Sequence, residues 1–199
     1  MRSKGTITLV VLAVVLGLAG CGATSSYNSL VQSDERVKTA WSNLQAQYQR
    51  RADLIPNLVE TVQGAADFEK ETLQAVTEAR AKATSIQVTP EDLDDPQRLQ
   101  QFQQAQSALG QSLGRLLAVS ENYPKLQATQ AFSDLQAQLE GTENRITVAR
   151  RDYNQAVQQY NTQVRSFPTV LFAGLMGFPP RTAFEAEAGA EQAPDVNFD

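Results

Sequence analysis

An apolar residue recurs at every third or fourth position from Phe132 to Val164, in the stretch FSDLQAQLEGTENRITVARRDYNQAVQQYNTQV. This is the heptad spacing of a long amphipathic helix that packs against another helix. A second stripe with the same spacing runs from Val37 to Val62. No segment of the sequence alternates with the period of two that marks a strand. The two stripes predict an all-α fold built on two long helices.

Proline, glycine and capping residues divide the remaining sequence into shorter helices. Pro56 falls inside the first stripe, where it should bend the helix or free a backbone carbonyl without ending the helix. Gly64 predicts the end of that helix, and Asp67 can cap a second one. Asp95, followed by a proline, is a typical start for a third. We expect an elongated antiparallel bundle of about four helices over residues 28–166, with coiled-coil-like packing.

The two long stripes can be aligned as antiparallel helices when paired residue numbers total about 201. Trp41 then lies opposite Tyr160, and Ile55 lies opposite Ile146. Every apolar residue of one stripe meets an apolar residue of the other, and the aromatic residues gather at one end. We predict this register.

The same register brings two arginine clusters together as a polar notch. Its predicted members are Arg50, Arg51, Asp53, Arg150, Arg151 and Asp152. One interpretation is a site for an anionic group, such as a phospholipid head or a carboxylate. The alternative, which we favour, is a set of interhelical ion pairs that fix register and orientation.

The N-terminus has the pattern of a lipoprotein signal peptide. A basic segment, Met1–Lys4, precedes an apolar run, Ile7–Leu16, that is too short for a comfortable membrane span. The run ends in Leu18-Ala19-Gly20-Cys21, which resembles a bacterial lipobox. We expect residues 1–20 to be removed and Cys21 to be lipidated, with acyl chains such as palmitate. Two or three chains give lasting anchoring. The alternative is an uncleaved anchor helix with a structural Cys21.

This lipidated end, residues 21–27, would join the bundle close to the membrane. Gly22 follows the cysteine, so the aspartate that retains enteric lipoproteins in the inner membrane is absent. We therefore expect a protein of the cell envelope that faces the periplasm or the exterior, with the outer membrane slightly favoured where there is one.

An apolar segment, residues 167–184, follows the last predicted helix and should pack on the end of the bundle. Antiparallel pairing returns it to the lipidated end. It is either a hydrophobic lid over the bundle or an interfacial foothold on the membrane. The candidate contact residues are Phe167, Leu171, Phe172, Leu175, Met176 and Phe178. Residues 185–199 are rich in Ala and Glu and should form a disordered acidic tail.

Composition excludes several function classes. The chain has 199 residues, no histidine, one cysteine and a formal net charge of −5. The missing histidine and the single thiol exclude zinc sites, nucleophiles paired with histidine, and disulfides within one chain. No basic surplus is available for nucleic acid. Four acidic residues between Glu91 and Asp95 lack the pattern of a calcium loop and suit a solvated turn.

Several motifs together resemble the LemA family of bacterial envelope proteins, over about residues 27–184. They include the stretches 50–64 (RRADLIPNLVETVQG), 113–118 (LGRLLA), 121–124 (ENYP), 149–154 (ARRDYN) and 160–161 (YN). The resemblance implies an elongated helical bundle, held at the membrane by its N-terminus and mostly outside the cytoplasm. Many members have a transmembrane helix where this sequence has a lipobox. Some relatives are associated with magnetosome membranes.

No enzymatic activity is established for that family, and no catalytic constellation is evident in the sequence. We expect no catalytic residue, no cofactor, no metal and no small-molecule substrate. We predict a non-enzymatic scaffold or adaptor, with the membrane and an unidentified envelope protein as its partners. The alternative is a membrane-organising protein that contacts lipid through residues 167–178.

Overall fold

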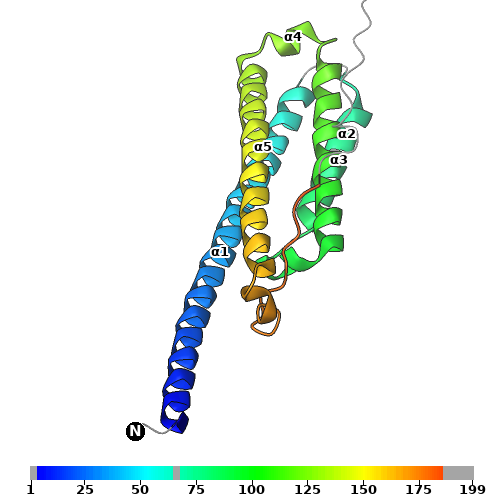
Figure 1. Cartoon of the computed structure of the whole chain (residues 1–199). Helices are drawn as coiled ribbons and strands as arrows, with labels where there is room; N and C mark the ends of the chain where they lie inside the picture. The colour runs from blue at the N-terminus through cyan, green and yellow to red at the C-terminus, as the bar shows by residue number, and fades with distance from the viewer. Residues whose placement is uncertain (1–3, 65–67, 186–199) are drawn as a thin grey trace, which may run out of the picture.

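The computed structural model describes residues 4–64 and 68–185 (Figure 1). Those ranges contain helices and no strand, so the predicted all-α fold is confirmed. The α-helices are α1 (Lys4–Gln63), α2 (Lys70–Ser85), α3 (Pro96–Ser120), α4 (Pro124–Gln127) and α5 (Gln130–Arg165); the 3-10 helices are η1 (Pro90–Asp94) and η2 (Thr169–Leu171).

The two longest helices, α1 and α5, pack against each other as an antiparallel pair (Figure 1). The next two helices form a hairpin in which α2 packs on α3, and α2 also contacts α1. The N-terminal part of α1 continues past the end of α5 and projects from the bundle (Figure 1). At 1.5 Å per residue, the 60 residues of α1 extend about 90 Å.

The core consists of two clusters along the bundle. The cluster near the projecting end of α1 is aromatic, with Trp41, Tyr153 and Tyr160 fully buried. The cluster towards α4 is mostly aliphatic, built around Ile55, Leu58 and other leucines, and it also contains Phe68 and Phe132. Trp41, Tyr153 and Tyr160 thus gather at one end as predicted, and they place three rigid, polar-tipped rings near the chain's C-terminal segment.

The predicted register of α1 and α5 is wrong by between one and two turns. The Trp41 ring lies 5.5 Å from the Tyr153 ring, and the Ser33 hydroxyl donates to Gln163 Oε1 at 2.7 Å. Paired numbers total 194 to 196 rather than 201. A heptad stripe displaced by seven residues still meets apolar residues, so the apolar pattern hardly distinguishes the two registers.

Pro56 lies inside α1, which continues through it as predicted. A proline has no N–H, so the carbonyl of Ala52 has no helical donor four residues ahead. The Arg80 side chain of α2 supplies one: its Nε donates to the Ala52 carbonyl at 2.7 Å. The break in the hydrogen bonds of α1 therefore becomes a contact that ties α2 to α1.

The other helix ends also follow local signals. α1 ends at Gln63, directly before Gly64, and α3 begins at Pro96. The Asp95 carboxylate accepts from the N–H groups of Gln97 and Arg98, at 2.9 and 3.2 Å. α2 begins at Lys70, and its predicted cap, Asp67, lies outside the described residues.

The segment after α5 has two parts. Residues 167–177, here called the apolar loop, form a compact turn at the end of the bundle. They finish at Gly177, whose φ of +80° favours glycine. Residues 178–185, here called the strap, then run back along the bundle without regular secondary structure (Figure 1).

Candidate functional site

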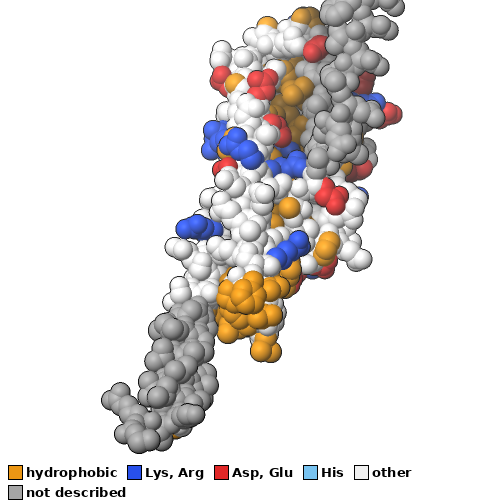
Figure 2. Space-filling view, viewed as in Figure 1, with side chains coloured by type: hydrophobic (Ala, Val, Ile, Leu, Met, Phe, Trp, Pro, Cys, Tyr) orange, Lys and Arg blue, Asp and Glu red, His pale blue; other side chains and the backbone are white. Residues whose placement is uncertain are grey.

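A groove of about 640 Å³ lies between α3 and α5. Its walls come from Gln103–Leu117 of α3 and Leu139–Arg150 of α5, and Tyr48 and Arg51 of α1 form part of its floor. Hydrophobic side chains line the hollow between the two helices (Figure 2). It is larger than two other hollows of the bundle, of about 340 and 450 Å³, and it is the candidate functional site.

Arg51 is the charged group at the base of this groove. Its side chain is 3% exposed and joins α1 to both α3 and α5. One terminal nitrogen donates to the Glu143 carboxylate of α5 at 2.9 and 3.2 Å. The other donates to the Gln106 side-chain and backbone oxygens of α3, at 2.6 and 3.1 Å. The guanidinium also lies 5.2 Å from the centre of the Tyr48 ring.

The predicted polar notch does not assemble as expected. Arg51 pairs with Glu143, which lies seven residues from the predicted Arg150, because the register differs by that amount. Arg50 and Asp53 are exposed, as are Arg151 and Asp152, which lie 3.7 Å apart. Arg150 contacts the strap instead: its guanidinium stacks 5.3 Å from the Phe184 ring. The observed interhelical ion pair joins one predicted residue to a partner that we did not predict.

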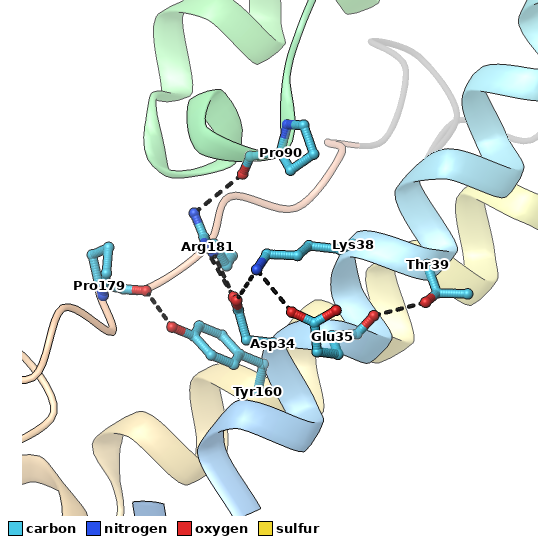
Figure 3. Close-up of polar contacts among 8 residues, drawn as sticks. All are labelled: Asp34, Glu35, Lys38, Thr39, Pro90, Tyr160, Pro179 and Arg181. Carbon is cyan, nitrogen blue, oxygen red and sulfur yellow. Dashed lines mark hydrogen bonds and ion pairs between the residues drawn. The ribbon is translucent and has the colours of Figure 1, made fainter. Parts of the chain in front are cut away.

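A second polar network holds the strap at the aromatic end of the bundle (Figure 3). Arg181 donates to Asp34 Oδ1 from Nη2 and Nε at 2.9 and 3.2 Å, and both side chains are 10% exposed. Lys38 Nζ forms an ion pair with the other carboxylate oxygen of Asp34, Oδ2, also at 2.9 Å. The Tyr160 hydroxyl donates to the Pro179 carbonyl at 2.9 Å. The network joins α1, α5 and the strap.

The environment of this network shifts the pKa of its groups. Burial alone would raise the pKa of Asp34, but the hydrogen bonds and charges of Lys38 and Arg181 outweigh burial and hold this pKa below its usual value. Burial raises the pKa of the Tyr160 hydroxyl to about 12. Burial also raises the pKa of Tyr153. The strap is therefore held by a carboxylate that stays charged and hydroxyls that stay neutral.

Two asparagines of α5 bind the backbone of the strap. Asn161 donates through Nδ2 to the Arg181 carbonyl and accepts the Arg181 N–H, both at 2.8 Å. Asn154 does the same for Phe184, at 3.0 and 2.9 Å. The strap ends in the described structure at Glu185, whose carbonyl accepts from Gln103 of α3 at 2.9 Å. These bonds recognise an extended chain by its backbone.

The candidate contact residues of the apolar loop are mostly exposed. Phe167 is 80% exposed, Leu171 73%, Leu175 92% and Met176 45%, and with Val170 they form an apolar surface at the end of the bundle (Figure 2). The other two predicted residues lie inward. Phe172 is half-buried, and Phe178 packs edge-on against Tyr27 of α1, with ring centres 5.6 Å apart.

The predicted lipidation site falls in the projecting part of α1. The helix is continuous through Cys21, whose side chain lies outside the described residues, so its lipidation stays a prediction. Among the described residues, no helix is long and apolar enough to cross a membrane. The predicted tail, residues 185–199, lies outside the described residues after Glu185.

The acidic turn before α3 has a local structural explanation. Asp92 accepts from the backbone N–H and the hydroxyl of Thr89, at 2.9 and 3.0 Å, which forms a capping box on η1. In the part of the chain that the structure describes, no group of three potential metal ligands is found.

A comparison with known families gives residues 40–198 as a match to the model described as the LemA family. This chain belongs to the LemA family. It is 25% identical over 206 residues to magnetosome protein MamQ 2 of Paramagnetospirillum magneticum, covering 94% of this chain and 76% of that protein. It is 27% identical to magnetosome protein MamQ of Magnetospirillum gryphiswaldense, covering 88% of this chain and 71% of that protein. Protein LemA of Metamycoplasma hominis is also 27% identical, and the match covers 71% of this chain and 61% of that protein. None of these names denotes an enzyme.

Sequence reasoning missed most of the residues that build the groove and hold the strap. Asn154 and Asn161 carry a detectable signal, because polar amides seven residues apart beside the apolar stripe of α5 share one face. Glu143 and Gln106 carry none: each is one of many polar residues on its helix, and only the observed register brings either one to Arg51.

Proposed function

We propose that this LemA-family chain is a non-enzymatic scaffold of the cell envelope. In this proposal a lipid on Cys21 anchors the chain, the apolar loop rests on the membrane, and the bundle holds another envelope protein. Family membership, together with relatives whose names denote no enzyme, supports a binding role. Location and anchor are proposed from the lipobox-like sequence ending at Cys21.

The observation that carries the proposal is the charge-free apolar end of the bundle. No charged residue occurs in the sequence between Phe167 and Pro180, or between Cys21 and Ser33. The ring contact of Tyr27 with Phe178 brings these two stretches together. The loop exposes large apolar side chains that a water-soluble end would bury. An apolar surface beside an acylated cysteine suits the membrane interface.

The same observation favours a second candidate function, direct action on the membrane. A loop that inserts Leu171, Leu175 and Met176 among lipid headgroups could organise the bilayer without a protein partner. Relatives are named magnetosome proteins, which is compatible with either role. The two candidates differ in what the bundle contacts, since a scaffold binds a protein away from the loop and a membrane-organising protein does not.

The loop contact can be tested in the full acylated chain in liposomes that contain doxyl-labelled lipids. Leu175→Cys carries a fluorophore in the apolar loop, and Ser133→Cys carries it at the other end of the bundle, where Ser133 is exposed. Both variants share the anchor, so the anchor cannot cause a difference between them. We expect strong quenching at position 175 and little at position 133. Equal quenching at the two positions would refute the loop contact.

The scaffold role is tested by crosslinking in cells, followed by mass spectrometry, with Cys21→Ala as the unanchored control. A scaffold should give one protein partner that only the anchored form captures. If only lipid adducts appear, mapped to residues 167–178, the scaffold proposal is wrong and the membrane-organising function replaces it. If the anchored chain is not acylated at Cys21, the proposed anchor itself is wrong.

A further inference from the structure

We propose that the groove between α3 and α5 is the binding site of the chain's own C-terminal segment, residues 186–191. In place of the disordered tail that composition predicts, this segment would follow the strap directly and lie in the groove as an extended chain. Residues 186–199 lie outside the described part of the chain. The strap, the lining of the groove and the order of residues after Phe184 point to this placement, which goes beyond the proposed function and does not rest on it.

The strap leads the chain to the groove. Successive strap residues are bound by α5 side chains that lie progressively closer to the start of that helix. The carbonyl of the last described residue, Glu185, accepts from Gln103 and Arg150, at 2.9 and 3.4 Å. Both of these side chains also line the groove. The residue that follows Glu185 therefore begins at the groove.

The spacing of the strap on α5 continues this path along the groove. Asn161 and Asn154 lie seven residues apart, which is about 10.5 Å along a helix. The strap residues that they bind, Arg181 and Phe184, lie three residues apart, which is roughly 9–10 Å in an extended chain. One further step of seven along α5 reaches Thr147, which lines the groove. The third residue after Phe184 is thus expected beside it.

The order of side chains after Phe184 suits an extended segment with one side on the groove. Phe184 is 5% exposed and packs on the Trp41 ring, whereas its neighbours Ala183 and Glu185 are exposed. Neighbouring side chains of an extended chain point to opposite sides. Alanine is too weakly apolar for the residues that follow to mark a strand by themselves. Continued past Glu185, however, the alternation turns three alanines towards the groove and the residues between them towards water: Ala186, Ala188 and Ala190 against Glu187, Gly189 and Glu191.

The lining of the groove accepts a chain that turns small side chains inward. On α3, Gly110 and Gly114 stand in the wall, and a Cβ added at Gly114 would meet nothing within 4 Å. The buried Leu113 adds apolar surface for the alanines. The wall on α5 extends from Leu139 to Arg150, about 16 Å of helix. Five or six extended residues cover that length, which matches the proposed segment.

Both walls also carry side chains that can bind the backbone of the segment. Ser107 and Gln111 stand on α3, and Asn144 stands on α5. Hydroxyl and amide groups both donate and accept, as the asparagines that hold the strap do. The main-chain groups of an extended segment in the groove would therefore find partners there.

Docking of this segment closes the side of the bundle between α3 and α5. The match to the LemA family runs through it, to residue 198. The segment is therefore part of the family's chain and not an extension beyond it. Any protein that binds between α3 and α5 must displace the segment, so the segment controls access to the groove.

Distances between spin labels test the placement. In a full chain with Cys21→Ala, nitroxides on Glu191→Cys and Gln159→Cys attach only at those two positions, and the result does not depend on the proposed lipid. Gln159 is exposed on α5. The spacing along α5 places Glu191 near Leu139, and the helix from there to Gln159 extends about 30 Å. Double electron–electron resonance should give one narrow distance near that value.

Two matched pairs of variants identify the groove as the site. Gly114→Trp places an indole in the groove, whereas Ala108→Trp places it at an exposed position of the same helix that does not line the groove. Ala188→Asp turns a charge towards the lining, whereas Gly189→Asp adds the same charge on the side that faces water. In each pair, the first variant should reduce the population with the narrow distance by more than half and the second should leave it unchanged. Circular dichroism checks that each variant stays helical.

Several results would overturn the inference. These are a broad range of distances in the chain that carries only the labels, a narrow distance that Gly114→Trp leaves unchanged, or equal effects of the two aspartates. A narrow distance that disappears when labelled chains are diluted with unlabelled ones would place the segment on a second copy, and docking within one chain would be rejected. The quenching and crosslinking experiments test the loop, the anchor and the partner separately, so failure here leaves the scaffold proposal standing.

Discussion

Removing the Arg80 side chain, which donates a hydrogen bond to the Ala52 carbonyl of α1, should destabilise the fold by an amount that depends on Pro56. Arg80 donates from Nε to the Ala52 carbonyl at 2.7 Å, a carbonyl that lacks its helical partner because residue 56 is proline. Arg80→Met keeps most of the aliphatic stem and removes the donor. In a Pro56→Ala background, the backbone N–H at position 56 can bond the same carbonyl, so the arginine is no longer needed there.

The magnitude follows from the kind of bond that is lost. A hydrogen bond from a charged donor contributes about 1.5–3 kcal/mol, and Arg80 is only half-buried, which favours the lower part of that range. We therefore expect Arg80→Met to cost about 1.5–2 kcal/mol in the natural chain. In the Pro56→Ala background, we expect its cost to be under about 0.5 kcal/mol. The coupling between the two positions is then about 1–2 kcal/mol, within the range found for residues in contact.

Urea unfolding followed by circular dichroism measures all four chains of this cycle. For a domain of this size, about 1.5–2 kcal/mol corresponds to a decrease in Tm of roughly 3–8 °C. Arg115→Met, at an exposed arginine of α3, controls for the loss of a surface charge. If Arg80→Met costs the same with and without Pro56, the bond to Ala52 does not stabilise the fold in the way we describe.

Two further outcomes test the polar groups of the bundle. In urea unfolding, Glu143→Ala should cost about 3–5 kcal/mol, because it leaves the buried Arg51 charge without its partner. Arg51→Met should cost less, about 1–3 kcal/mol, because the Glu143 carboxylate that remains is reached by water. The reverse order of the two costs would contradict this account. The pKa of Asp34 is lowered in the folded chain, so its stabilisation is complete above the unfolded pKa and is lost as pH falls through the folded pKa. The Tm of Asp34→Asn should therefore decrease less steeply than that of the natural chain as the pH falls below about 4. If Tm decreases equally steeply with pH in both chains, the contact between Asp34 and Arg181 does not stabilise the strap.

The features that sequence predicted well are those set by local physical chemistry. The heptad stripes fixed which faces of α1 and α5 are buried, because burial of an apolar stripe needs no knowledge of the partner's register. The start of α3 follows from Asp95, and the end of α1 follows from Gly64. Even the consequence of Pro56 was predictable, because a missing N–H frees one particular carbonyl. What sequence could not supply was the donor, Arg80, which comes from another helix.

The segment that Asn154 and Asn161 bind was beyond sequence reasoning for a different reason. Its bonds join main-chain groups of residues 178–185 to asparagines and tyrosines of α5, and main-chain groups look alike in every sequence. The apolar loop was predicted as a unit with the strap, over residues 167–184. The structure separates the two at Gly177, where a φ of +80° turns the chain back along the bundle. Only the loop presents its apolar side chains at the bundle end.

The register of the long helices and the floor of the groove depend on the same residue. Apolar stripes seven residues out of register pack almost equally well, so a polar contact must choose between them. Arg51 makes that choice through Glu143, and through Gln106 it also ties α3 to the same point. The guanidinium lies beside Gly110 of α3, where an added Cβ would be 3.7 Å from Arg51 Nη1. The residue that selects the register, the buried Arg51, therefore also forms part of the floor of the groove.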